Sequence, residues 1–496
     1  MTISTLIISF AIVGAILTFL TSRIVTHKSW FLTFLQNFTG VWFIFSGFVK
    51  AVDPYGTAIK MEQYFADFET TIKGTALKGI SGVFPVLSHN AMTFSIIMIL
   101  LELLVGVMLI LGYRSKLTSW LFLIIIAFFT VLTGYTHLTG YVPSGVNFFE
   151  FSKWGAFDET NRRVTDCGCF GDFLKLDPRI SFYKDLFLSA IALIFVFRYK
   201  GFTALFTSRI RGAILTVVGV VTLLFCFRNA FWNEPMIDFR PFQVGVNIRD
   251  RKKAEEHAME TIAITYVYKN KKSGQEVRLT MEEYMKQFKN FPKDEWDFKQ
   301  EKGEPDVPHS KISDFSVSDV KGSDATDSIL NEKNYLFLAV SYDLHSTVSE
   351  KKIVVPDTVF VYDTVKIAPI KGVITEPKIV KAVKSIGKKE ETLKSFSFDK
   401  TLRDEFLQKL NPLLEAAEKA GYKDAALVAF ADPHKIDDFR HETNSAYPFY
   451  TADDLVVKTM MRSNPGLFLL KDGQIIGKWH IDHLPSMDEL KANYIK

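Results

Sequence analysis

Two cysteines separated by one glycine are the residues of this sequence best suited to chemistry. Cys167 and Cys169 lie in the stretch DCGCFGD, residues 166–172. A pair of thiols on the oxidising side of a membrane is typical of a redox couple. Gly168 removes the Cβ that would obstruct a tight ring, and the strain that remains makes such a disulfide easy to reduce. The spacing therefore favours thiol–disulfide exchange over a permanent cross-link.

The charged neighbours of this pair would tune its reactivity. Asp166 and Asp172 would raise the pKa values of the thiols if they lie close, so activation would need a cation such as Lys175 or Lys184. Two other interpretations stay open. The thiols could be structural and pack their loop onto neighbouring helices, or they could bind zinc. Zinc needs four ligands and only His137 is near in sequence, so we expect no metal site.

The amino-acid composition of the chain changes sharply near Trp232. Residues 1–232 contain 19 Lys and Arg and 12 Asp and Glu, whereas residues 233–496 contain 40 and 43. The net charge of +4 is small for 496 residues, so no nucleic-acid surface is expected. All three cysteines lie in the first part, which excludes a disulfide-stapled secreted scaffold. The pattern predicts a membrane domain followed by a soluble domain.

Six apolar stretches in the first part are long enough to cross a bilayer. They run approximately over residues 3–21, 34–52, 92–112, 118–137, 181–197 and 213–230. The first has no basic leader and no small-residue cleavage site, so we expect it to be retained. The first, third and fifth loops are basic and contain no acidic residue, which indicates the cytoplasmic side. We therefore expect a multi-pass protein of a bacterial inner membrane, with both termini and the cysteine-containing loop in the periplasm.

Two charged residues within the predicted spans are candidates for supporting roles. Glu102 lies in the middle of the third span, where a carboxylate usually faces the bundle interior. It could move protons or contact a quinone, or it could simply hold helices together. Lys50 lies near the outer end of the second span. It could pair with Glu102 if it reaches inward, or extend toward the lipid headgroups.

Four stretches taken in order, residues 43–54, 101–106, 166–172 and 182–185, carry a resemblance to known proteins. Through them, residues 34–200 resemble the DoxX-like/MauE-like family of four-helix membrane proteins. It implies redox work in the cell envelope, such as maturation of disulfide-bearing periplasmic enzymes or thiosulfate–quinone chemistry. Cys167 and Cys169 would then exchange electrons with a periplasmic thiol protein or with a quinone. The chain departs from the family in its extra N-terminal span and long tail; similar long chains are familiar from Bacteroidota.

The soluble part reads as a short connecting region followed by an α/β domain. Residues 233–329 predict an extended tether and a β-hairpin, with strands near 262–268 and 276–280. Residues 330–496 alternate strands and helices, and an Asp-Gly turn at 472–473 joins two apolar runs. Residues 347–395 interrupt this order as an inserted hairpin or a mobile arm.

The order of elements over 330–496 resembles a thioredoxin-like domain. Asn464 and Pro465 precede the last hairpin and resemble the family's cis-proline element, which implies a cis Pro465 and an Asn464 backbone presented to a partner. A proline that merely starts a strand is the alternative. Residues 343–347 replace the Cys-x-x-Cys of the family, and no cysteine follows Cys226. The tail is therefore expected to bind a partner rather than to carry out dithiol chemistry.

The sequence is compatible with two functions. In the first, the protein is an envelope redox component in which the cysteine pair exchanges electrons and the tail binds the partner. In the second, it is a non-catalytic, membrane-anchored assembly or interaction factor whose cysteines are structural. We favour the first because of the Cys-Gly-Cys spacing.

Overall fold

The computed structural model describes residues 2–164, 168–303, 305–365 and 378–495. These residues form two compact units. The first comprises Met1–Ser313 together with Lys458–Ser463 and Lys478–His483. The second comprises Asp314–Val457, Asn464–Gly477 and Leu484–Lys496.

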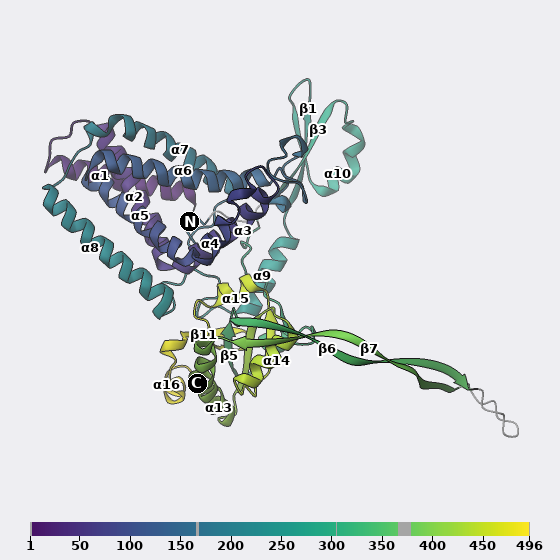
Figure 1. The fold of residues 1–496 in the computed structure, drawn as a ribbon. Helices are drawn as coiled ribbons and strands as arrows, with labels where there is room; N and C mark the ends of the chain where they lie inside the picture. The colour runs from purple at the N-terminus through teal and green to yellow at the C-terminus, as the bar shows by residue number, and fades with distance from the viewer. Residues whose placement is uncertain (1, 165–167, 304, 366–377, 496) are drawn as a thin grey trace. The chain divides into compact units, whose positions relative to one another are not determined.

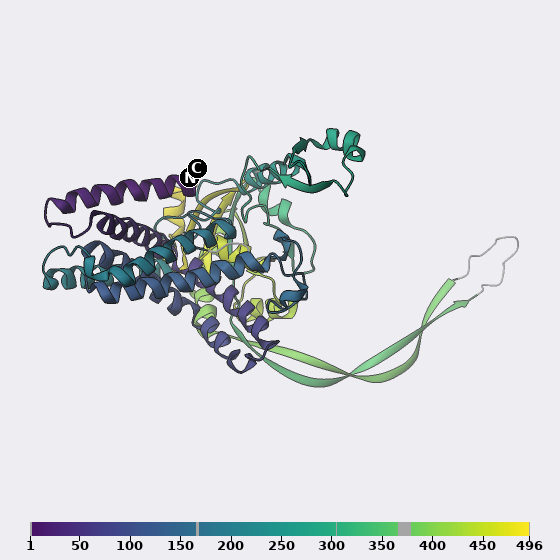
Figure 2. The same cartoon turned by 90° about the horizontal axis from the view of Figure 1, so that it is seen from above.

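Six helices of the first unit, within the described ranges, are long and apolar enough to cross a membrane. They are α1 (Ile3–Ser22), α2 (Trp30–Val52), α5 (Ala91–Leu111), α6 (Ser115–Thr139), α7 (Pro178–Arg198) and α8 (Ser208–Phe227). The six expected spans are thereby confirmed, and a lipid bilayer is the environment that these helices require. The helices lie side by side in Figures 1 and 2.

Helix α2 occupies the centre of this bundle because it packs against both α1 and α5. A Cβ on Gly106 would come within 2.8 Å of the backbone nitrogen of Ile44 and 2.9 Å of the Gly40 carbonyl oxygen. Only glycines allow the two backbones to approach this closely. The close crossing brings Lys50 of α2 next to Glu102 of α5.

The segment between α2 and α5 is helical, which the sequence reading did not predict. It contains α3 (Pro54–Lys73) and the shorter α4 (Val83–His89). Asp53 caps α3 by accepting a hydrogen bond from the Gly56 amide at 3.0 Å, and Pro54 occupies its first turn. Tyr64 and Phe65 of α3 are buried against the bundle. The mixed charge of this segment does not indicate a membrane span, although one side of α3 is apolar and buried against the bundle.

The rest of the first unit follows α8. A π-helical turn, η5 (Arg228–Trp232), leads to α9 (Ile248–Glu260) and to a three-stranded antiparallel sheet with the order β2-β1-β3. Its strands are β1 (Ile264–Asn270), β2 (Glu276–Leu279) and β3 (Trp296–Lys302), and α10 (Met281–Gln287) follows β2. The hairpin β1–β2 was predicted and β3 was missed, because β3 is rich in Lys, Glu and Asp. The short 3₁₀ helices of this unit are η1 (Lys78–Ile80), η2 (Phe151–Lys153), η3 (Glu159–Asn161), η4 (Tyr199–Gly201), η6 (Phe288–Asn290) and η8 (Ile481–His483).

The second unit is built on a six-stranded mixed sheet with the order β11-β10-β5-β8-β9-β4. Its strands are β4 (Val317–Asp319), β5 (Tyr335–Ser341), β8 (Lys423–Ala429), β9 (Phe449–Ala452), β10 (Gly466–Lys471) and β11 (Gln474–His480). Strand β5 pairs parallel with β8 and antiparallel with β10, and all its residues are buried. Its helices are α11 (Thr326–Leu330), α12 (Lys400–Glu405), the π-helical η7 (Phe406–Leu410), α13 (Asn411–Lys419), α14 (Pro433–Glu442), α15 (Asp454–Met460) and α16 (Met487–Asn493).

Two features of the second unit correspond to specific expectations. Residues inserted after β5 form a long antiparallel ribbon of β6 (Ser346–Val365) and β7 (Lys378–Phe398), drawn in green in Figure 2. The Asn464–Pro465 peptide bond is cis, as the resemblance of this segment implies. The expected mixed α/β tail is therefore present.

Candidate functional site

Cys169 is buried in the loop that joins α6 and α7, residues 140–177, which we call the Cys loop. The residue is 7% exposed, and its carbonyl oxygen accepts a hydrogen bond from the Ser46 hydroxyl of α2 at 2.9 Å. Burial raises the pKa of the Cys169 thiol, and Lys184 opposes this effect. Cys167 and Asp166 lie outside the described residues.

A buried ion pair stabilises the hydrogen bond between Ser46 and Cys169. Lys50 Nζ lies 2.6 Å from Glu102 Oε2 and donates a hydrogen bond to Ser46 Oγ at 3.2 Å. The side chains of Lys50 and Glu102 are 4% and 3% exposed. Lys50 therefore reaches inward and does not extend toward headgroups. Glu102, Lys50 and Ser46 form a continuous polar chain that ends on the backbone of Cys169.

A second buried pair lies on the α7 side of the same loop. Lys184 Nζ is 2.6 Å from Asp185 Oδ1, and Thr133 of α6 donates to Asp185 Oδ2 at 3.0 Å. The Lys184 ammonium also lies 5.7 Å from the ring centroid of Phe170, the residue after Cys169. Lys184 was predicted as a compensating cation. Asp185 was not singled out, although its place beside a lysine at the start of an apolar span was a usable signal.

Asp172 lies near two cationic side chains. Its carboxylate lies 3.5 Å from Lys175 Nζ and 3.8 Å from Arg462 Nη2. The second contact comes from a segment almost three hundred residues later in the chain. It could not be expected from the sequence.

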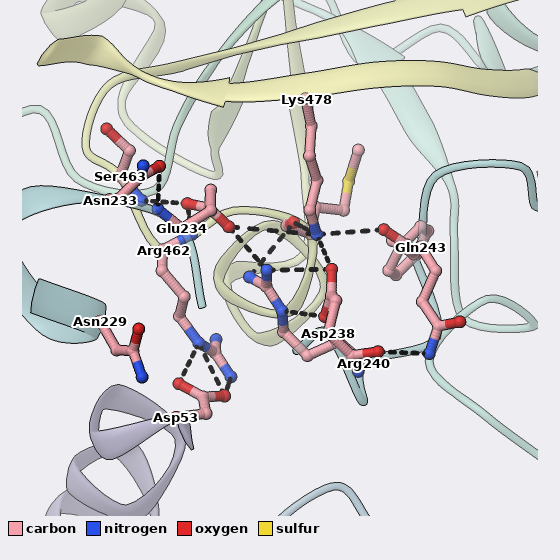
Figure 3. A network of polar contacts seen from close by, with 12 residues as sticks. Asp53, Asn229, Asn233, Glu234, Asp238, Arg240, Gln243, Arg462, Ser463 and Lys478 are labelled. Carbon is pink, nitrogen blue, oxygen red and sulfur yellow. Dashed lines mark hydrogen bonds and ion pairs between the residues drawn. The ribbon is translucent and has the colours of Figure 1, made fainter. Parts of the chain in front are cut away.

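Arg462 belongs to a cluster of six charged residues, with side chains between 1% and 18% exposed, that sequence reasoning missed (Figure 3). We call it the charge cluster; it consists of Asp53, Glu234, Asp238, Arg240, Arg462 and Lys478. Arg462 Nη2 lies 2.6 Å from Asp53 Oδ2 and its Nε 2.9 Å from Asp53 Oδ1, a bidentate pair with Arg462 only 3% exposed. Burial opposes ionisation of Asp53, but Arg462, together with Arg240 and the Gly56 amide, outweighs this effect and lowers the pKa of Asp53.

Glu234 connects the two halves of the charge cluster. Its Oε1 accepts hydrogen bonds from the backbone amides of Arg462 and Ser463 at 3.0 and 2.9 Å. Its Oε2 lies 2.6 Å from Arg240 Nη2, and Arg240 Nε lies 2.7 Å from Asp238 Oδ1. Lys478 pairs with Asp238. The sequence predicts only a tether after α8. In the structure, charged residues of this segment form ion pairs and hydrogen bonds with residues 458–463 and 478–483.

Acid should weaken this network through Asp238. Burial opposes ionisation, but Arg240 and Lys478 outweigh it and lower the pKa of Asp238 from 3.8 to about 2. Because the folded-state pKa is the lower one, the contribution to stability is full above pH 4 and is lost as the pH falls toward 2. The shift corresponds to about 2 kcal/mol. We expect Asp238→Asn to reduce the free energy of unfolding by about this amount at pH 6 and by much less at pH 2.5, measured by denaturant titration of the detergent-solubilised protein.

Asp250 supplies the control for this prediction. Its carboxylate is 66% exposed beside Arg249, so Asp250→Asn should change stability by less than about 1 kcal/mol. A difference between Asp238→Asn and wild type that stays constant from pH 6 to pH 2.5 would contradict the assigned role of Asp238.

Asn464, predicted to present its backbone to a partner, uses its side chain within the second unit. Its Oδ1 accepts hydrogen bonds from the Ser341 hydroxyl at 2.7 Å and from the Tyr342 amide at 3.0 Å, and its Nδ2 donates to the Asp343 carbonyl at 2.8 Å. Asn464 therefore clamps the segment that follows β5. Presentation of the Asn464 and Pro465 backbone to a partner stays a prediction.

The comparisons with known proteins match part of the membrane half. Residues 28–144 match the family model of the methylamine utilisation protein MauE. Neither the curated proteins nor the solved structures give a match. The matched region contains α2, α3, α4, α5 and α6, and therefore Ser46, Lys50 and Glu102, but it ends before Cys169. In the described ranges, no three His, Cys, Asp or Glu side chains are grouped as a metal ion would need. The chain is thus a membrane protein that is MauE-like over residues 28–144.

Proposed function

We propose that this protein is a redox component of the bacterial cell envelope in which Cys167 and Cys169 exchange thiol and disulfide states. The observation that carries the proposal is the surroundings of Cys169. Its backbone is held by the polar chain from Ser46 to Lys50 and Glu102, and the Lys184 ammonium lies 5.7 Å from the ring centroid of the next residue, Phe170. A merely structural thiol does not need two buried lysines, which are costly to place in a membrane bundle.

The proposed location is the inner membrane, with both termini and the Cys loop in the periplasm. The support is the distribution of basic residues over the first, third and fifth loops, which contain no acidic residue. In this orientation the cysteine pair and the second unit share an oxidising compartment. Labelling of intact, reduced cells with a membrane-impermeant maleimide should modify Cys167. Labelling only after permeabilisation would contradict the orientation.

The burial of Cys169 suggests different roles for the two cysteines in the exchange. Because burial raises the pKa of Cys169, it is the poorer nucleophile, and Cys167 is proposed to attack. The Cys167 thiolate attacks one sulfur of a partner's disulfide, and the other partner sulfur leaves as a thiolate. Cys169 then attacks the Cys167 sulfur of the mixed disulfide and releases the second partner thiolate. Two electrons pass to the partner, and the protons lost by the two cysteines end on its thiols. The reverse sequence would oxidise a partner dithiol.

The second unit is proposed to be a thioredoxin-like binding module. The support is the arrangement of β5 between a parallel β8 and an antiparallel β10 that is followed by β11. Since no cysteine follows Cys226, this unit would bind the redox partner and leave exchange to the Cys loop.

Replacing both cysteines by serine tests the proposal. The Cys167→Ser/Cys169→Ser variant should leave the periplasmic partner in its unexchanged oxidation state, and Cys169→Ser alone should accumulate a mixed disulfide through Cys167 that identifies the partner. Cys226→Ser is the matched control, because Cys226 is a fully buried residue of α8. Wild-type partner oxidation in the double variant would rule out the redox function and favour the alternative, a non-catalytic assembly factor. The burial of Cys169 is the observation that favours this alternative.

A further inference from the structure

An open pocket lies where α6 begins, at the end of this helix opposite to the Cys loop. Its volume is about 630 Å³, within the range of cavities that bind small ligands. We call it the α6 pocket. All of its lining residues belong to the first unit and to the described ranges. They are Arg114, Ser115, Lys116, Leu117 and Trp120.

Two basic side chains of the α6 pocket have no acidic partner. Arg114 and Lys116 are exposed, and their side chains form no hydrogen bond or ion pair with another residue of the described ranges. The lining contains no carboxylate, and residues 103–149 contain no Asp or Glu. The loop between α7 and α8, residues 199–207, contains none either. The positive charge of the pocket is therefore not cancelled by the segments that surround it.

A third cation lies next to the α6 pocket. Arg211 of α8 donates a hydrogen bond to the Gly112 carbonyl oxygen at 2.7 Å, which connects α8 to the turn before α6. The guanidinium carbons of Arg211 and Arg114 lie 5.9 and 5.6 Å from the ring centroid of Tyr113. Like charges gathered around one ring repel each other, and an anion between them removes this repulsion. The charges therefore favour an anionic ligand.

The other part of the α6 pocket is apolar. Leu117 and Trp120 are 45% and 48% exposed, and their spacing of three residues places them on one side of α6. An indole near the end of a membrane span lies at the level of the lipid headgroups. The pocket thus presents cations at the end of the span and apolar groups toward its middle. A phospholipid presents its phosphate and its acyl chains in the same order.

We propose that the α6 pocket binds an anionic phospholipid. The phosphate accepts hydrogen bonds from Arg114 and Lys116, and an acyl chain packs on Leu117 and Trp120. Basic pockets beside membrane helices bind headgroups of this kind. A phosphatidylglycerol is favoured over a phosphatidylcholine, because the choline group would place a positive charge close to the two cations. This site is separate from the proposed exchange of the Cys loop.

Trp120 provides a local readout of the lipid in the pocket. The full-length protein is reconstituted into bilayers that contain both lipids in a fixed ratio, with bromine on the acyl chains of either the phosphatidylglycerol or the phosphatidylcholine. Bromine quenches nearby indoles, and the difference between wild type and Trp120→Phe isolates the quenching of Trp120. The relative association constant at Trp120 should be at least about fivefold higher for phosphatidylglycerol, since one basic residue contributes about this factor. The preference should diminish in about 1 M salt.

Two charge-removing variants and one charge-preserving variant locate the preference. Arg114→Gln/Lys116→Gln should bring the relative association constant close to one. Arg23→Gln/Arg209→Gln removes two exposed charges outside the pocket lining and should keep the preference. Arg114→Lys/Lys116→Arg should also keep it, which separates the loss of charge from a loss of folding.

Three results would overturn the assignment of the α6 pocket. They are equal quenching of Trp120 by the two brominated lipids, a preference that persists in Arg114→Gln/Lys116→Gln, and an equal loss of preference in Arg23→Gln/Arg209→Gln. The last result would mean that the general positive charge of these loops attracts the lipid. Because the measurement involves no cysteine, its outcome is independent of the proposed exchange.

Discussion

Arg462→Gln should release the backbone of residues 458–463 from the charge cluster. The substitution leaves Asp53 buried without its bidentate partner, and breaking a buried ion pair in this way costs about 3–5 kcal/mol. The Arg462 and Ser463 amides, which donate to Glu234, should then exchange with deuterated solvent about a hundredfold faster or more. Hydrogen exchange with mass spectrometry of the detergent-solubilised protein measures this directly.

Two control variants test whether the faster exchange comes from the loss of the Asp53–Arg462 pair. Lys419→Gln removes an exposed ion pair, with side chains 78% and 63% exposed, and should leave amide exchange unchanged. The combination Asp53→Asn/Arg462→Met removes both charges and keeps an oxygen to cap α3, so it should recover most of the protection. Unchanged exchange of residues 458–463 in Arg462→Gln would mean that the Asp53–Arg462 pair does not hold this segment.

Glu102→Gln should expose Cys169. The substitution leaves the Lys50 ammonium buried without a counter-charge, again at a cost of about 3–5 kcal/mol. Because Lys50 supports Ser46 and Ser46 holds the Cys169 carbonyl, the Cys loop should open more often. In a Cys167→Ser/Cys226→Ser background, maleimide should modify Cys169 about a hundredfold faster than in the same protein with Glu102.

The controls for this prediction lie in the same bundle and the same loop. Lys50→Met/Glu102→Leu replaces the pair by apolar side chains and should stay within about tenfold of the parent rate, since no unpaired charge is left. Lys153→Gln removes an exposed pair with Glu150 in the Cys loop and should have no effect. A parent-like rate in Glu102→Gln would show that the polar chain does not position Cys169.

Local sequence information was sufficient to predict the membrane helices and the last hairpin of this protein. The six membrane helices follow from apolar runs of about 20 residues, because the bilayer thickness sets that length. The hairpin of β10 and β11 follows from the Asp-Gly turn between two apolar runs. Helix α3 was missed because its mixed charge does not give the apolar pattern of a membrane span. Strand β3 was missed because a strand at the edge of a sheet does not need an apolar sequence.

The sequence alone thus determined which segments enter the membrane and which residues could carry thiol chemistry. Only the tertiary structure decided which charges meet. Lys50 had two possible directions, and the close glycine crossing of α2 and α5 turned it toward Glu102. Asp53 and Arg462 are 409 residues apart, and no local pattern links them. Buried charges are tolerated only beside a partner, and that partner is supplied by packing between distant segments rather than by the residues on either side.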